Sequence, residues 1–158
     1  MTDTPTVPDY LRHIHVVLTR TSHPGNIGAA ARAMKTMGLS RLTLVAPNLM
    51  ATPMTPEPPA FDADRAAAFQ LPEESFILAS GARDVLEQAQ IVATLDEALA
   101  DTVLSCALTS RRRELSAPLH TPRELVPELL QAAQQGFQVA LVFGNETFGL
   151  NIDEVQRC

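Results

Sequence analysis

Residues 14–38 read IHVVLTRTSHPGNIGAAARAMKTMG, and this stretch decides the fold that we expect. Its first six residues, Ile14 to Thr19, form an apolar, β-branched run that is typical of a buried strand. Residues 26–37 are rich in Ala, Met, Arg and Lys, which favour a helix, and Gly38 follows where a helix cap belongs. The stretch therefore predicts a strand, a glycine-rich loop and a helix in succession.

The same alternation of strand-like and helix-like segments continues along the chain. An alternation of this kind predicts an α/β domain with a mainly parallel sheet and helices on both faces. We interpret residues 102–109 as a central, buried strand, and we expect the proline-rich residues 47–60 to form an irregular loop. The other strands are expected at 41–47, 90–94 and 137–144, and the helices within 72–88, at 95–101, at 121–136 and from 151 onward.

Length and composition indicate a globular, cytoplasmic protein. The 158 residues fit one domain, of which 46% are hydrophobic and 19% charged, so neither disorder nor a fibrous repeat is expected. No apolar run reaches the length of a membrane span, and the first ten residues lack the order of a signal peptide. Cys106 and Cys158 form neither a metal-ligand spacing nor a disulfide framework, so no metal is predicted.

Charge is unevenly distributed along the chain. The net charge is -6, which argues against a protein coated with positive charge. From Leu11 to Pro56, however, there is no acidic residue, whereas Glu57 to Asp101 contains ten of them. The asymmetry is either accidental or indicates a local positive face for an anionic ligand. The cations of the first segment are Arg12, Arg20, Arg32, Lys35 and Arg41.

Three polar clusters directly follow predicted strands. They are TSHPGNIG at 21–28, TSRRRE at 109–114 and GNETFGL at 144–150. In parallel sheets, ligands bind at the carboxyl ends of the strands. The sequence therefore predicts that the three loops form one site.

Each cluster taken alone allows more than one interpretation. The turn at 25–28 either holds a phosphate at a helix N-terminus or is a plain connection, since it completes neither a Walker loop nor a dinucleotide fingerprint. Arg32 either meets an anion or is a solvated helix residue, and Glu146 either pairs with Arg32 or is a surface residue of a turn at the end of a strand. The three arginines 111–113 either clamp nucleic-acid phosphates or are a solvated run. Nothing in the spacing selects a catalytic triad that uses Ser22 and His23.

The clusters together resemble a known family. HPGNIGAAARAMKTMGLSRLTLVAP at 23–47 resembles the first motif of the SpoU branch of the SPOUT RNA methyltransferases, and ALVFGNETFGL at 140–150 resembles the second. TSHPGNIGAAARAMKTMG, with TLDEAL and TSRRREL further on, is especially similar to the TrmJ-type tRNA 2'-O-methyltransferases. The resemblance covers about residues 13–158, which we expect to form the methyltransferase domain after a tail at 1–12.

The resemblance implies an α/β trefoil-knot fold, S-adenosylmethionine as methyl donor, a homodimer, and a cytidine or uridine ribose at position 32 of the tRNA anticodon loop as acceptor. It implies catalytic roles for Asn26, Arg32 and Glu146. The cofactor-binding positions that it implies are Thr109, Ser110, Arg111, Gly144 and Leu150. The RNA-binding cations that we predict are Arg20, His23, Lys35, Arg112 and Arg113.

Two departures from the family pattern stand out. TrmJ-type proteins usually have Arg where this chain has Asn145, which bears on the substrate position. The third family motif, which closes the knot, is absent because the sequence ends at Cys158. We therefore expect these residues to belong to a longer protein, with the last knot segment beyond residue 158.

The mechanistic hypothesis centres on Arg32. A guanidinium cannot act as a base near neutral pH, so we expect Arg32 to bind the phosphate beside the target ribose and to stabilise the developing alkoxide. Asn26 would orient Arg32, and Glu146 would fix its rotamer. The alternatives are a catalytically silent RNA-binding knot domain, a methyltransferase acting on another tRNA or rRNA ribose, and a generic mononucleotide-binding domain.

Overall fold

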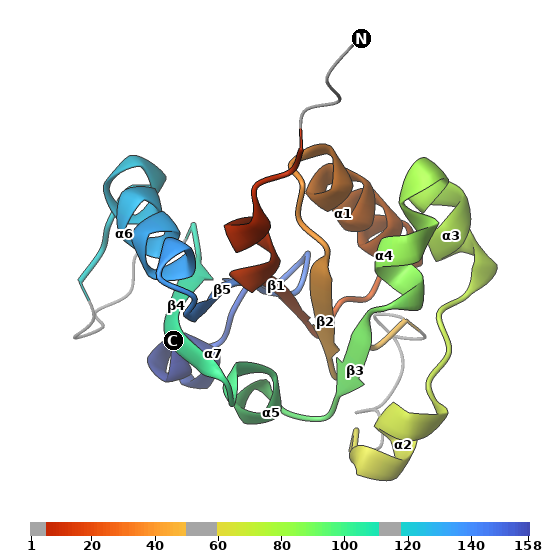
Figure 1. Cartoon of the computed structure of the whole chain (residues 1–158). Helices are drawn as coiled ribbons and strands as arrows, with labels where there is room; N and C mark the ends of the chain where they lie inside the picture. The colour runs from red at the N-terminus through yellow and green to blue at the C-terminus, as the bar shows by residue number, and fades with distance from the viewer. Residues whose placement is uncertain (1–5, 50–59, 111–117) are drawn as a thin grey trace, which may run out of the picture.

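The computed structural model describes residues 6–49, 60–110 and 118–158. Within them, five strands form a sheet in the order β3-β2-β1-β5-β4, and every pair of neighbours is parallel. Helices lie on both faces of this sheet (Figure 1), which confirms the predicted fold class. The strands are β1 (Ile14–Thr19), β2 (Arg41–Val45), β3 (Gln90–Val92), β4 (Thr102–Leu108) and β5 (Gln138–Phe143).

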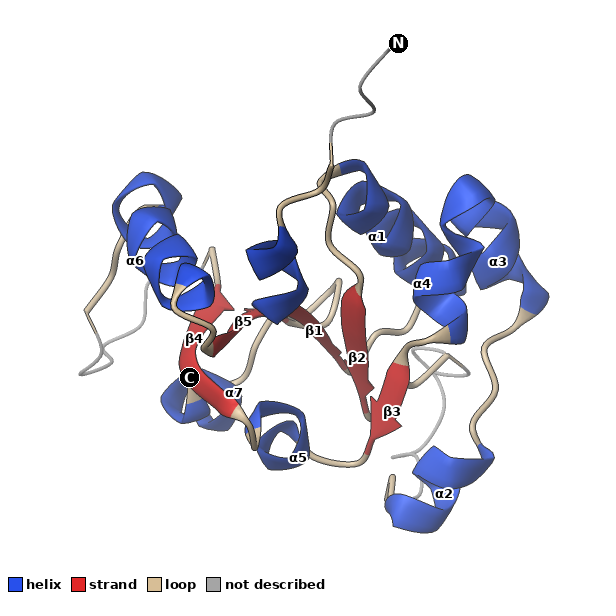
Figure 2. Cartoon of the chain, viewed as in Figure 1, coloured by secondary structure: helices blue, strands red, loops and turns tan. Residues whose placement is uncertain are grey.

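Helices and strands alternate along the chain (Figure 2). The predicted helices are confirmed near their expected places: α1 (Pro24–Thr36), α3 (Glu73–Ala79), α4 (Arg83–Glu87), α5 (Leu95–Leu99), α6 (Pro122–Gln134) and α7 (Ile152–Arg157). The sequence did not predict η1 (Asp9–His13), which falls largely within the expected tail, α2 (Ala63–Ala68) or η2 (Ser80–Ala82). Most of the proline-rich loop, residues 50–59, lies outside the described residues.

Alternate side chains of the central strands feed two separate cores. Ile14 and Val16 of β1 pack in the core beneath α1, α4 and α6. Val17 points to the opposite face, where it packs with residues of α5 and α7. A strand buried on both faces needs a continuous apolar run, and this is why Ile14 to Thr19 was recognisable as a strand.

Helix α1 begins two residues earlier than the sequence predicted. Pro24 occupies the first turn, where its fixed φ and missing N–H suit a helix start. Gly38 has a φ of 79° just after the helix, as expected for a glycine cap. A Cβ on Gly28 would lie 2.2 Å from the carbonyl oxygen of Ser75, so only glycine lets α1 approach α3 this closely.

The prediction that residues 102–109 form a central strand is wrong. β4 pairs with β5 alone and lies at one edge of the sheet, with its side chains half-buried. The centre is occupied by β1 and by β5, the last strand in sequence. An apolar run indicates burial, but the insertion of a later strand between two earlier ones leaves no local signal.

His15 is a buried histidine that titrates abnormally. Its side chain is fully buried, and its Nε2 lies 2.6 Å from the Thr43 hydroxyl. Burial, and to a lesser extent the charge of Arg41, lowers the pKa of His15 to about 4. The folded chain therefore binds fewer protons than the unfolded chain between about pH 6.5 and 4, so its free energy of unfolding falls as the pH drops through that window.

We expect the burial of His15 to make the free energy of unfolding fall when the pH is lowered. Between about pH 7.5 and 5, chemical denaturation should show a loss from His15 of about 2 kcal/mol in the free energy of unfolding. His15→Gln should abolish that part of the slope, whereas the matched change at the exposed His120 should not. A wild-type slope in His15→Gln would show that His15 is not the cause.

Candidate methyl-donor pocket and acceptor turn

The three polar clusters follow strands that are neighbours in the sheet. Leu18 at the end of β1 and Leu108 at the end of β4 both pair with Phe143 at the end of β5. The loops that follow therefore emerge side by side at one edge. This confirms that 21–28, 144–150 and the first two residues of 109–114 meet, whereas Arg111, Arg112 and Arg113 lie outside the described residues.

A pocket of about 690 Å³ opens between β4, β5, α6 and the loop after β5. Its wall combines apolar side chains from α6 with backbone and polar groups from the loops. Thr109, Ser110 and Gly144, three of the residues that we predict to bind the cofactor, line it. The sequence did not predict the α6 wall of Pro122, Leu125, Val126 and Leu129, because an apolar stripe at helical spacing is also what a core-facing helix shows.

Leu150, a residue predicted to bind the cofactor, has its side chain in the core beside the pocket. It is fully buried and packs with Val17, Val142 and Val155 in the core under α7. Its side chain packs in the core and so fixes the end of the loop, and it is not among the described residues that line the pocket.

The loop between Gly144 and Gly149 doubles back on itself. Gly149 has a φ of 68°, and its N–H donates to the Asn145 carbonyl at 2.8 Å. A Cβ on Gly144 would lie 2.2 Å from the Gly149 carbonyl carbon and 2.2 Å from the Leu150 nitrogen. No side chain fits at residue 144, so this close approach of two backbone segments depends on glycine.

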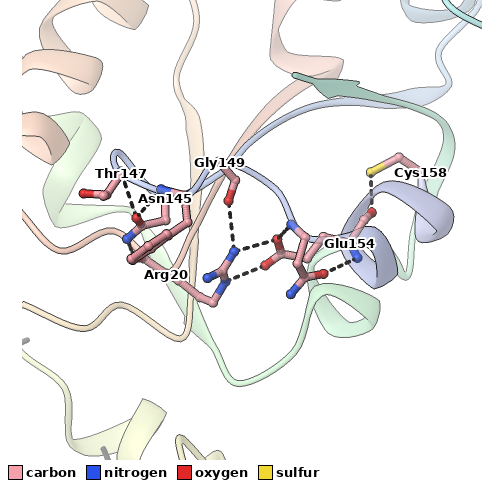
Figure 3. Close-up of polar contacts among 8 residues, drawn as sticks. Arg20, Asn145, Thr147, Gly149, Glu154 and Cys158 are labelled. Carbon is pink, nitrogen blue, oxygen red and sulfur yellow. Dashed lines mark hydrogen bonds and ion pairs between the residues drawn. The ribbon is translucent and has the colours of Figure 1, made fainter. Parts of the chain in front are cut away.

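Asn145, the departure from the family pattern, holds the loop in shape (Figure 3). Its Oδ1 accepts hydrogen bonds from the Thr147 N–H at 2.9 Å and the Phe148 N–H at 3.0 Å. Its Nδ2 donates to the Arg20 carbonyl at 2.8 Å, which ties the loop to the end of β1. The departure thus has a structural role in this chain.

Arg20, a predicted RNA-binding residue, makes an intramolecular ion pair with Glu154. Its Nε and Nη2 donate to the two carboxylate oxygens of Glu154 at 2.8 and 2.9 Å, and Nη2 also donates to the Gly149 carbonyl (Figure 3). Partial burial tends to raise the pKa of Glu154, but hydrogen bonds from Arg20 and Asn151 outweigh it and hold this pKa below its ordinary value. The guanidinium is therefore held by groups of its own chain while it stays partly exposed.

Glu146 binds the turn that begins α1. Its carboxylate accepts hydrogen bonds from the Ser22 N–H at 3.0 Å, the Ser22 hydroxyl at 2.9 Å, the His23 N–H at 3.2 Å and the Asn26 amide at 3.1 Å. Burial tends to raise the pKa of Glu146, but these hydrogen bonds outweigh it and lower the pKa. The carboxylate is thus a fixed anion that joins two of the predicted loops.

The predicted pairing of Glu146 with Arg32 is wrong. Asn26 faces Glu146, and Arg32 follows six residues later, which is about 240° further round the helix. Arg32 is exposed and lies in a separate groove between α1 and α3, which Ala29, Ala33, Thr36, Met37 and Leu78 also line. Opposite charge favoured Arg32 as the partner of Glu146, but no pattern in the sequence indicates that backbone N–H groups bind this carboxylate.

Most of the cations in the acid-free segment are paired with acids. Lys35, a predicted RNA-binding residue, lies 2.8 Å from Asp84, and Arg41 lies 2.9 Å from Asp101. Arg12 pairs with Asp9 and Arg20 with Glu154. Within the described part of the chain, Arg32 is the cation of this segment that makes no ion pair, so the predicted positive face is reduced largely to this residue.

The described residues contain no group of three or more His, Cys, Asp or Glu that could hold a metal ion. In the same residues, no helix is long and apolar enough to cross a membrane.

The imidazole of His23, another predicted RNA-binding group, is at the exposed N-cap of α1, beside the turn that Glu146 binds.

A solved structure that is similar to this chain shows the family to which the chain belongs. A crystal structure of a protein from Neisseria gonorrhoeae, assigned to a methylase family, is 73% identical and superposes with a TM-score of 0.87 over 98% of this chain and 71% of that chain. The chain therefore belongs to this methylase family. A scan of protein-family models found no match.

Within this family, the relatives with curated names are of the TrmJ type. The tRNA (cytidine/uridine/adenosine-2'-O-)-methyltransferase TrmJ of Pseudomonas aeruginosa is 43% identical over 148 residues, which are 94% of this chain and 50% of that protein. The crystal structure of TrmJ from Z. mobilis is 33% identical, with a TM-score of 0.69 over 89% of this chain and 53% of that chain. The chain spans about half the length of the curated relatives that it matches.

Proposed function

We propose that the protein transfers the methyl group of S-adenosylmethionine to a ribose 2'-hydroxyl of tRNA. The observation that carries the proposal is the joining of the two family motifs through Glu146, at the mouth of a pocket of small-molecule size. The names of the TrmJ relatives support tRNA as the substrate and the 2'-oxygen as the acceptor. The cytidine or uridine at position 32 remains our prediction for the target.

The residues of the pocket fit the methyl donor. The loop brings two backbone segments together at Gly144, where a side chain would prevent their contact, so peptide groups can face a ligand directly. Thr109 and Ser110 add polar groups, and the apolar side chains of α6 suit an adenine ring and a methionine chain. The bound donor would supply an activated sulfonium methyl group, whose leaving group is neutral after transfer.

The chain must then place the acceptor oxygen in line and stabilise the charge that develops on it. We assign this to Arg32, which would hold the phosphate beside the target ribose. Asn26 is held by Glu146 at the edge of the pocket and would contact the acceptor nucleotide. Asn26 faces Glu146 and not Arg32, so the expected role of Asn26 in orienting Arg32 is not part of this proposal.

Arg32 does not line the pocket of its own chain in the described residues. We propose that it reaches the pocket of a second copy, so that the active enzyme is a homodimer. The face of α1 that carries Arg32 supports this, because Ala29, Ala33 and Met37 are exposed around it. An exposed apolar face around a lone unpaired cation suits a subunit interface.

We place the enzyme in the cytoplasm, where tRNA is modified.

The experiment that tests the proposal supplies the protein with methyl-labelled S-adenosylmethionine and unmodified tRNA. We expect label to enter the tRNA, and calorimetry to show donor binding that S-adenosylhomocysteine competes away. A silent RNA-binding domain would bind tRNA with a strong dependence on salt but would transfer no label. That result, in a protein shown to be folded, would overturn the proposed activity.

A further inference from the structure

Arg20 contacts both ends of the loop that walls the pocket, although it does not line the pocket in the described residues. Its carbonyl accepts from Asn145 Nδ2 at 2.8 Å, and its Nη2 donates to the Gly149 carbonyl at 3.0 Å (Figure 3). Asn145 and Gly149 are themselves joined by a backbone bridge. One residue therefore grips the loop where it leaves the sheet and where it returns.

The backbone of Arg20 adopts an unusual conformation to make these contacts. Its φ is 51°, a left-handed value that costs free energy for a residue with a side chain. Its N–H donates to the Val45 carbonyl at 2.8 Å, which fixes the residue to the end of β2. The strained conformation turns the carbonyl of Arg20 toward the loop that begins at Gly144.

The side chain of Arg20 is in turn oriented by helix α7. Glu154 is 9% exposed and binds the guanidinium with both carboxylate oxygens. Glu154 is fixed by a capping box, in which its carboxylate accepts from the Asn151 N–H at 2.7 Å and the Asn151 side chain accepts from the Glu154 N–H at 2.8 Å. The start of α7 thus determines where the guanidinium points.

We propose that Arg20 is a positioning residue, which holds the 144–149 loop in the conformation that binds the methyl donor. This inference rests on the proposed function, since it names the device that preforms the donor site. Nη2 donates to a carboxylate oxygen of Glu154 and also to the Gly149 carbonyl, so the guanidinium binds both groups at once. A lysine ammonium keeps the charge but cannot reproduce this planar arrangement of donors.

The test compares Arg20→Lys with Arg157→Ala. Arg157 also pairs α7 with another element, through Asp96 at 2.6 Å, and the hydrogen bonds of its side chain in the described part of the chain go to Asp96 and not to the loop. For Arg20→Lys we expect donor Kd and donor KM to rise about tenfold, the loss of roughly one hydrogen bond to a charged group, with kcat at saturating donor within about twofold. Hydrogen exchange at the Gly149 amide should accelerate, while Arg157→Ala leaves donor affinity and this amide unchanged.

Two results would overturn the inference: wild-type donor affinity in Arg20→Lys, or the same loss of affinity in Arg157→Ala. A purely structural role would lower the melting temperature of Arg20→Lys but leave its donor KM and its Gly149 exchange as in the wild type. If the wild-type protein binds no S-adenosylmethionine, the proposed function fails, and Gly149 exchange alone then decides whether Arg20 holds the loop.

Discussion

Replacing Arg32 by alanine is expected to lower methyl transfer at saturating donor by about a hundredfold or more, because the change removes the cation assigned to the acceptor phosphate and the developing alkoxide. Donor affinity should not change, since Arg32 lies in the groove between α1 and α3 and not on the described pocket wall. Steady-state turnover with tRNA, measured beside a calorimetric donor titration, separates the two effects.

The matched control for this variant is Lys35→Ala on the same helix. Lys35 is already paired with Asp84 at the surface, so its removal should change turnover by no more than about twofold. Wild-type turnover by Arg32→Ala would remove Arg32 from the mechanism. An equal loss in both variants would indicate a general effect of positive charge on RNA binding.

Replacing Gly144 by alanine is expected to weaken donor binding by roughly a hundredfold, because the added methyl group forces the loop open. Its Cβ would lie 2.2 Å from the backbone at Gly149 and at Leu150, and neither backbone segment can move without opening the pocket wall. Calorimetric titration with S-adenosylmethionine measures the loss, and thermal melting shows whether the variant folds.

Gly81 offers the control for this substitution. A Cβ there meets no atom within 4 Å, so Gly81→Ala should bind the donor as the wild type does. Donor affinity that stays at the wild-type value in Gly144→Ala would show that the loop does not form the donor site.

The two variants together test whether the site is shared between subunits. A chain with Arg32→Ala keeps an intact pocket, and a chain with Gly144→Ala keeps an intact arginine. In a random mixture of the two, mixed dimers contain one complete site, so activity should recover to about a quarter of the wild-type value. A mixture no more active than either variant alone would show that Arg32 serves its own chain.

The sequence predicted the elements that carry local signals. β1 is a mostly apolar, β-branched run, Gly38 follows the end of α1, and the three polar clusters follow strands. Their convergence at one edge followed from the parallel sheet alone. The order of the strands was not accessible, because the insertion of β5 between β1 and β4 depends on packing between distant segments.

The sequence also did not allow us to predict which groups the charged side chains would bind. Glu154 and Arg20 are 134 residues apart, and no spacing rule links them. Asn151 and Glu154 form a capping box that the pattern Asn-x-x-Glu could have indicated, although not its use in holding Arg20. Glu146 found its partners in Ser22, His23 and Asn26 rather than in the cation that its charge suggested.

In the mechanism that we propose, a methyl group passes from the donor in this pocket to a ribose 2'-oxygen of tRNA. The most direct measurement is mass-spectrometric mapping of nucleotides after the protein acts on tRNA with a labelled donor. We expect label on the 2'-oxygen of a pyrimidine nucleotide in the anticodon loop, and none when that nucleotide carries a 2'-deoxyribose. Label on a base, or no label in tRNA from a folded protein that binds the donor, would contradict this mechanism.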